Sequence, residues 1–172
     1  MTDTLVNRVA SSGIMTIDLE TYYPASQIAV IDLKDYLYKE LILREKEFRT
    51  ALKEMDWSAY QGQIVAVYCS TDAIIPMWAY MLVATYLNGV AEEVYQGDVA
   101  SYLAHYYDRR LEQLDTEAYR DRMVVIKGCG AKPVPAAAYL KLTSVLQPIA
   151  KSIMYGEPCS TVPIYKRPRP QS

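Results

Sequence analysis

The sequence predicts an α/β protein with a mainly parallel sheet flanked by helices. Runs typical of strands alternate with runs typical of helices, at the spacing of β-α-β units. Two runs, IVAVY at 64–68 and MVVIK at 123–127, are continuously apolar, which is typical of strands covered on both faces. We find no internal linker and no repeat of structural length. We therefore expect a single domain over residues 1–165, followed by a flexible basic tail at 166–172.

The remaining strands are predicted from shorter patterns. MTIDL at 15–19 alternates apolar and polar residues, as a half-exposed strand does. IAVID at 28–32 follows the turn-prone stretch TYYPAS, and EEVYQ at 92–96 is a short candidate. SIMY at 152–155 is predicted as the last strand.

The helices are predicted from apolar periodicity and from their end signals. Around residues 43–56, one helical face carries Phe48, Ala51, Leu52 and Met55. The stretch 76–87 is apolar nearly all round, which predicts a helix buried in the core or against a partner chain. Asp98 is an N-cap candidate for the next helix, and Pro135 and Pro148 bracket the last one.

Composition excludes several classes of protein. A net charge of −2 argues against nucleic acid as the main partner, because phosphate binding needs a basic surface. No apolar run is long enough to span a membrane, and the N-terminus lacks the apolar stretch of a signal peptide. We therefore expect a cytoplasmic protein whose cysteines stay reduced.

Aromatic usage is unusual, with 16 tyrosines against the single phenylalanine Phe48. Tyrosine can bury its ring while its hydroxyl stays hydrogen-bonded. One interpretation is a thin core of half-buried aromatics. The other is a non-enzymatic interaction protein, a homo-oligomer that associates through its tyrosines and the apolar helix at 77–87.

The three cysteines share one pattern. Cys69, Cys129 and Cys159 each follow a predicted strand and precede small or turn-forming residues and a proline. Because parallel strands with right-handed crossovers end at the same edge of a sheet, we expect these thiols to converge there. Their separation in sequence matches no zinc-finger or ferredoxin signature.

Convergent thiolates predict a metal site. Thiolates select zinc, cuprous copper or an iron–sulfur cluster, and three of them leave one coordination position open. Asp72 is the candidate fourth ligand, and Lys127 and Lys132 could offset the thiolate charge. Structural cysteines are the alternative, and a cysteine nucleophile is the third interpretation. The sequence has no C-x-x-C and no C-x5-R, and its only histidine, His105, is expected on a helix surface.

The loop KGCGAKP places Cys129 between two glycines where a strand meets a helix. Glycine lets the backbone turn sharply and lets a ligand approach closely. Such a loop can also direct N–H groups at an anion, which would make the protein an anion- or nucleotide-binding enzyme. The candidate binding residues are Lys127, Gly128, Gly130 and Lys132. The loop matches no established phosphate-binding motif.

Three stretches carry a resemblance to a known family: CSTDAIIPMWAYML, VVIKGC followed by KPVPAAAY, and KSIMYGEPCSTVP. With VASSGIMTIDLETYYP and LILREKEFRTALKEMDW, they resemble an uncharacterised bacterial family, domain of unknown function 2480, over nearly the whole chain. The resemblance implies a link to iron–sulfur metabolism, which favours an iron–sulfur cluster over zinc. It implies no reaction and no substrate, and it identifies neither a small-molecule nor a protein partner.

Overall fold

The computed structural model describes residues 13–169, which divide into two compact units. The discontinuous unit combines residues 13–23 with residues 103–169, and the continuous unit is Pro24–Tyr102. The single domain over residues 1–165 stays a prediction. Of the predicted tail at 166–172, residues 170–172 lie outside the described residues.

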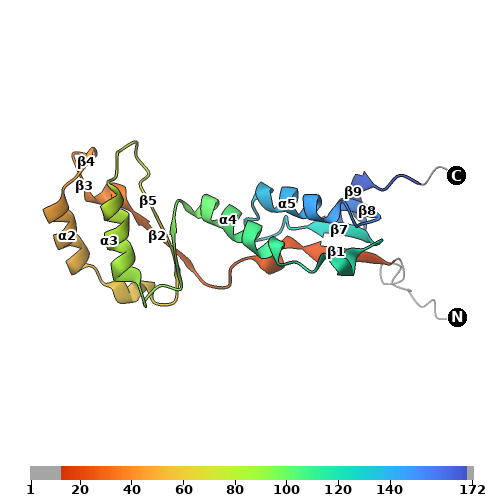
Figure 1. Ribbon diagram of the computed structural model, residues 1–172, viewed down its shortest axis with the longest axis horizontal. Coiled ribbons are helices and arrows are strands. Elements are labelled where there is room, and N and C mark those ends of the chain that lie inside the picture. The colour runs from red at the N-terminus through yellow and green to blue at the C-terminus, as the bar shows by residue number, and fades with distance from the viewer. Residues whose placement is uncertain (1–12, 170–172) are drawn as a thin grey trace. The chain divides into compact units, whose positions relative to one another are not determined.

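The continuous unit is a three-stranded parallel sheet with the order β2-β5-β6. Its strands are β2 (Ile28–Asp32), β5 (Ile64–Tyr68) and β6 (Glu93–Gln96), and its helices are α2 (Glu45–Glu54) and α3 (Met77–Leu87). Parallel register places Ile31 beside Val67, so both side chains point to one face of the sheet. Both helices pack on that face, as the buried core of Val67, Phe48 and Val83 shows (Figure 1).

The discontinuous unit has a four-stranded sheet with the order β1-β7-β8-β9. The parallel strands are β1 (Ile14–Asp18), β7 (Met123–Lys127) and β8 (Ser152–Glu157), and β9 (Ser160–Lys166) returns antiparallel beside β8. Residues of α4 (Val99–Glu112) and α5 (Ala136–Leu146) share a buried core with β1, β7 and β8 (Figure 1). The predicted α/β class with mainly parallel pairing is confirmed.

Four short 3-10 helices among the described residues begin in the same way, after a capping aspartate. They are η1 (Leu19–Tyr22), η2 (Leu33–Tyr36), η3 (Trp57–Tyr60) and η4 (Thr116–Tyr119). Each is preceded by an aspartate whose carboxylate accepts the N–H of the residue two positions later, as an N-cap does. In η1 this bond runs from the Glu20 N–H to Asp18 at 3.0 Å, so it sets where the Glu20 side chain starts.

The two units repeat one design. Residues 56–98 correspond to residues 115–157 without a gap, so that η3, β5, α3 and β6 match η4, β7, α5 and β8. Equivalent backbone bonds recur: the Gly62 N–H donates to the Val90 carbonyl at 2.8 Å, and the Asp121 N–H donates to the Ile149 carbonyl at 2.9 Å. The prediction that the chain contains no repeat is therefore wrong.

The repeat is difficult to recognise in the sequence for two reasons. Matched positions keep their burial but often change residue, as Phe48 and Tyr107 or Val83 and Leu142 do. In addition, β1 and β2 follow each other directly in the chain, although each pairs with the central strand of a different unit. The repeated parts are therefore interleaved and do not follow one another as complete units.

Two details differ from the predictions. The helix α3 buries only one face, formed by Ala79, Val83 and Leu87, whereas Met77 is 70% exposed and Met81 is 68% exposed. Oligomerisation through this helix stays a prediction. The strand β9 and the short hairpin of β3 (Leu37–Tyr38) and β4 (Ile42–Leu43) were not predicted. Among the described residues, no helix has the length and apolar character needed to cross a membrane.

Tyr107 offers a test of the core of the discontinuous unit. Its side chain is fully buried, and its hydroxyl donates to the Leu19 carbonyl at 2.9 Å. The Tyr107→Phe variant should lower the free energy of unfolding at pH 7 by about 1–3 kcal/mol, because the Leu19 carbonyl loses that bond. Phenylalanine is the residue at the matched position, Phe48, so the ring itself suits this core. Denaturant titration measures the change, and an unchanged free energy would contradict it.

The same phenol predicts a pH dependence. Burial raises the pKa of Tyr107 to about 12, and nearby negative charges add to this effect. In the unfolded chain, the tyrosine hydroxyl loses its proton near pH 10. The stabilisation that the protonated Tyr107 hydroxyl provides is therefore complete below about pH 10 and is lost as the pH rises toward 12. The difference in unfolding free energy between wild type and Tyr107→Phe should therefore narrow between pH 10 and 12. A difference that stays constant over that interval would contradict the prediction.

Candidate functional site

The carboxyl ends of β1, β7 and β8 form the edge where the candidate site lies. Because β7 pairs in parallel with both neighbours, Asp18, Lys127 and Glu157 end adjacent strands at one edge of the sheet. The Lys127 ammonium lies 3.2 Å from the Asp18 carboxylate and 3.7 Å from that of Glu157. The hydrogen bond to Asp18 is the main cause that raises the pKa of Lys127, so this group stays charged at neutral pH.

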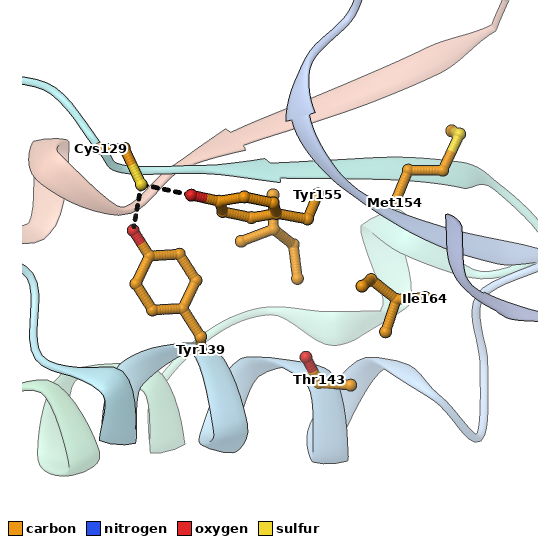
Figure 2. Close-up of a pocket in the computed structure, with 7 residues that line it drawn as sticks. Cys129, Tyr139, Thr143, Met154, Tyr155 and Ile164 are labelled. Atoms are coloured by element: carbon orange, nitrogen blue, oxygen red, sulfur yellow. Dashed lines mark hydrogen bonds between the residues drawn. The ribbon is translucent and has the colours of Figure 1, made fainter. Parts of the chain in front are cut away.

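Cys129 follows β7, and its thiol faces two tyrosine hydroxyls (Figure 2). Tyr139 comes from α5, and its hydroxyl lies 3.8 Å from the Cys129 Sγ. Tyr155 comes from β8, and its hydroxyl is hydrogen-bonded to the same sulfur. The two rings meet edge to face with centroids 5.9 Å apart, so each ring supports the orientation of the other.

Two cavities adjoin at this thiol. One has a volume of about 290 Å³ and is largely apolar, with Ile126, Thr143, Met154 and Ile164 in its wall (Figure 2). The other has a volume of about 430 Å³ and is polar, with Asp18, Glu20, Lys127 and Glu157 in its wall. Cys129 and Tyr155 line both cavities. A bound molecule at the thiol could therefore place an apolar part on one side and a polar part on the other.

Both phenols remain protonated at neutral pH. Burial is the first cause that raises the pKa of Tyr139, and its hydrogen bond to Cys129 is the second. The hydrogen bond to Cys129 is the main cause that raises the pKa of Tyr155. Each hydroxyl is therefore available as a hydrogen-bond donor to the sulfur, and a donor of this kind stabilises a thiolate more than a thiol.

The two glycines that flank Cys129 make room for two different groups. A Cβ at position 128 would lie 2.7 Å from the Tyr139 hydroxyl and 3.0 Å from the Leu19 Cβ. A Cβ at position 130 would overlap the Glu20 carboxylate. The first glycine therefore lets Tyr139 reach the thiol, and the second lets Glu20 reach the loop backbone.

The loop after β7 directs its N–H groups at an anion from the chain itself. Three consecutive N–H groups, those of Gly130, Ala131 and Lys132, donate to the Glu20 carboxylate, the last two at 3.1 Å and 3.3 Å. The predicted binding of an external anion or nucleotide by this loop stays a prediction, and Glu20 was not predicted. No sequence signal identifies this residue, because it belongs to a turn more than a hundred positions away. Lys132 lies 5.3 Å from the ring centroid of Tyr23.

The three cysteines are divided between the two units. Cys69 lies in the continuous unit, where it is half-buried and its sulfur is 3.3 Å from the Thr71 hydroxyl. Cys129 and Cys159 lie in the discontinuous unit and are exposed. Asp72 is exposed in the loop after Cys69. Within residues 13–169, no cluster of three or more His, Cys, Asp or Glu side chains could hold a metal ion. The metal site stays a prediction.

The repeat isolates what is particular to the Cys129 site. In the continuous unit, the positions that match Cys129, Tyr139 and Tyr155 are Ser70, Tyr80 and Gln96. One tyrosine is thus retained, whereas the thiol and the second phenol are absent from those positions. The shared fold therefore needs neither group, and their combination belongs to the discontinuous unit.

Comparison with known proteins gives a family and no activity. Residues 3–167 match the model of a family described as a protein of unknown function, DUF2480. Neither the curated proteins nor the solved structures contain a match to the chain.

The contact between Cys129 and Tyr155 predicts a change in tyrosine titration. In a Cys129→Ala variant, the pKa of Tyr155 should fall toward its ordinary value near 10, because the main cause of its elevation is removed. Carbon-13 NMR of labelled tyrosine rings, with Tyr155→Phe for assignment, measures the shift. A Cys159→Ala variant is the control and should leave the Tyr155 titration unchanged. An identical titration in Cys129→Ala would show that the two side chains do not interact.

Proposed function

The chain belongs to the DUF2480 family, whose description states no function, and from its own side chains we propose that Cys129 is a nucleophilic thiol. The substrate class is a small molecule with an electrophilic centre. The observation that carries the proposal is one exposed sulfur in contact with two phenol hydroxyls at the junction of two cavities. The location at the carboxyl edge of a parallel sheet is the usual place for a ligand in such folds.

Each part of the site has a role in this chemistry. Tyr139 and Tyr155 place two hydroxyl groups at the sulfur, and a hydroxyl that donates to a thiolate stabilises the reactive form of cysteine. The apolar cavity of about 290 Å³ takes the apolar part of the substrate. The polar cavity, with Lys127 between Asp18 and Glu157, takes its polar part. The electrophilic atom then lies at the junction, beside the Cys129 sulfur.

The covalent step is a nucleophilic displacement. The thiolate forms a bond from sulfur to the electrophilic atom, and the leaving group departs with its bonding electron pair. The phenols keep their protons before the step and donate to the sulfur in the ground state, so they raise the amount of thiolate but lower its intrinsic nucleophilicity. The first effect is the larger one when the pH lies below the titration range of an ordinary thiol.

Substitution of the two phenols tests the proposal. The parent is a Cys69→Ser, Cys159→Ser protein, in which Cys129 is the remaining thiol. Tyr139→Phe and Tyr155→Phe should each slow alkylation of Cys129 by iodoacetamide at pH 7 by at least about threefold, because each removes a hydrogen bond to the thiolate. Intact-protein mass spectrometry follows the reaction.

Tyr80→Phe supplies the matched control, because Tyr80 occupies the position of Tyr139 in the other unit. Its alkylation rate should equal that of the parent. Unchanged or faster alkylation in both Tyr139→Phe and Tyr155→Phe would reject the proposed role of the phenols. A parent rate no higher than that of a short cysteine peptide would reject Cys129 as an activated nucleophile.

A metal or iron–sulfur site that includes Cys129 and Cys159 is the second candidate function. The observation in its favour is that Cys129 and Cys159 are exposed and follow the neighbouring parallel strands β7 and β8. For this function, protein purified without oxygen should contain iron with acid-labile sulfide, or zinc, and Cys129→Ser should lose it. Metal-free wild-type protein from that preparation would reject this function and leave the nucleophile unaffected.

A further inference from the structure

We propose that Glu20 is a positioning residue for Cys129, an inference that rests on the proposed function. It acts through the backbone of the loop and not through contact with a substrate. Its carboxylate takes the place of an external anion at the three N–H groups of the loop.

Hydrogen bonds at the end of β1 hold the backbone of Glu20 in place. Its own N–H donates to Asp18 at 3.0 Å, and the Thr21 hydroxyl donates to the Asp18 carbonyl at 2.7 Å. The end of β1 and the start of η1 therefore form a closed local turn. Because β1 pairs with β7 through to Asp18 and Lys127, this turn lies beside the loop that follows β7. The Glu20 side chain consequently starts from a defined place.

The Glu20 side chain in turn binds the loop after β7. The N–H groups of Gly130, Ala131 and Lys132 all donate to its carboxylate, just before α5 begins. Converging N–H groups ahead of a helix form a binding arrangement for anions. In this loop the anion is a side chain of the same unit, so the backbone directly after Cys129 is tied to β1.

The same loop determines where the Cys129 thiol lies. Cys129 lies between Gly128, which admits the Tyr139 hydroxyl, and Gly130, which admits the Glu20 carboxylate. The Cys129 backbone is therefore confined on both sides, and its sulfur contacts Tyr139 and Tyr155. Release of the loop from Glu20 would loosen the placement of the sulfur against both phenols.

The continuous unit shows that the fold itself does not need this arrangement. Lys34 matches Glu20, and its N–H is held by Asp32 at 3.0 Å in the same way. The matching loop carries Thr71 where the other has Gly130, and the N–H of Ser70 donates to Asp32 at 3.0 Å. The carboxylate and the glycine thus occur together in the unit that contains Cys129, and lysine and threonine replace them in the other unit.

The test measures Cys129 alkylation by iodoacetamide in the Cys69→Ser, Cys159→Ser parent. Glu20→Ala should slow the reaction by at least about threefold, because the sulfur loses its placement against the phenols. The direction is diagnostic. Removal of a negative charge near a thiol by itself favours the thiolate and would speed the reaction. Sodium formate should restore the rate of Glu20→Ala in a concentration-dependent manner, since the formate ion can occupy the vacated place, and sodium chloride at equal ionic strength should not.

Two controls separate positioning from general destabilisation. Lys34→Ala changes the matched residue of the continuous unit and should react at the parent rate. Val124→Ala weakens the buried core of the discontinuous unit away from the loop and should also react at the parent rate below its unfolding temperature. If Glu20→Ala does not fold, Glu20→Gln carries the test and should also react more slowly than the parent, because its amide offers the loop one acceptor oxygen where the carboxylate offers two.

Each outcome decides a separate question. A parent rate that does not exceed that of a short cysteine peptide rejects the proposed function before Glu20 is considered. A parent rate above that value, with Glu20→Ala equally fast or faster, rejects the inference and retains the function. A slow Glu20→Ala that formate does not restore, together with an equally slow Val124→Ala, also rejects the inference.

Discussion

Parallel pairing of β7 with both β1 and β8 is the constraint on which the candidate site depends. It brings the ends of three strands that are far apart in the sequence to one edge of the sheet. Asp18, Lys127 and Glu157 form ion pairs there, and the segments just beyond them supply Glu20 and Cys129. Helix α5, which packs on the face of the sheet, contributes Tyr139. No local segment of the chain contains this combination.

The repeat separates what the fold requires from what the site adds. Both units keep a buried central strand, a helix that begins after a proline, and an aspartate that caps a short turn. The two units differ at the strand edge. The discontinuous unit has a glutamate, two glycines, a cysteine and two tyrosines there. At the matched positions, in the same order, the continuous unit has lysine, cysteine and threonine, serine, and tyrosine and glutamine. Matched core positions keep their burial while the edge changes its chemical groups, so the proposed chemistry depends on the edge of the discontinuous unit.

The sequence predicts the parts of this structure that depend on local patterns. Apolar runs such as 64–68 and 123–127 identify the central strands, since burial on both faces requires continuous apolar residues. Alternation of strands and helices then places Cys129 at the carboxyl edge. The surroundings of Cys129 could not be predicted, because Tyr139 and Tyr155 reach its sulfur, and Glu20 reaches the loop after it, only through tertiary packing. The strand β9 was missed because it carries Pro163 and mostly exposed residues, and its pairing with β8 has an irregular register.

The proposed function requires that the surroundings of Cys129 make its thiol more reactive than exposure alone would. Cys159 provides the comparison within the same molecule, because both cysteines are exposed and belong to the same unit. The most direct measurement is site-resolved mass spectrometry of wild-type protein during a time course with limiting iodoacetamide at pH 7. Cys129 should be modified at least about tenfold faster than Cys159, the factor that corresponds to one hydrogen bond of about 1.4 kcal/mol to the thiolate. Equal rates at the two cysteines would contradict it.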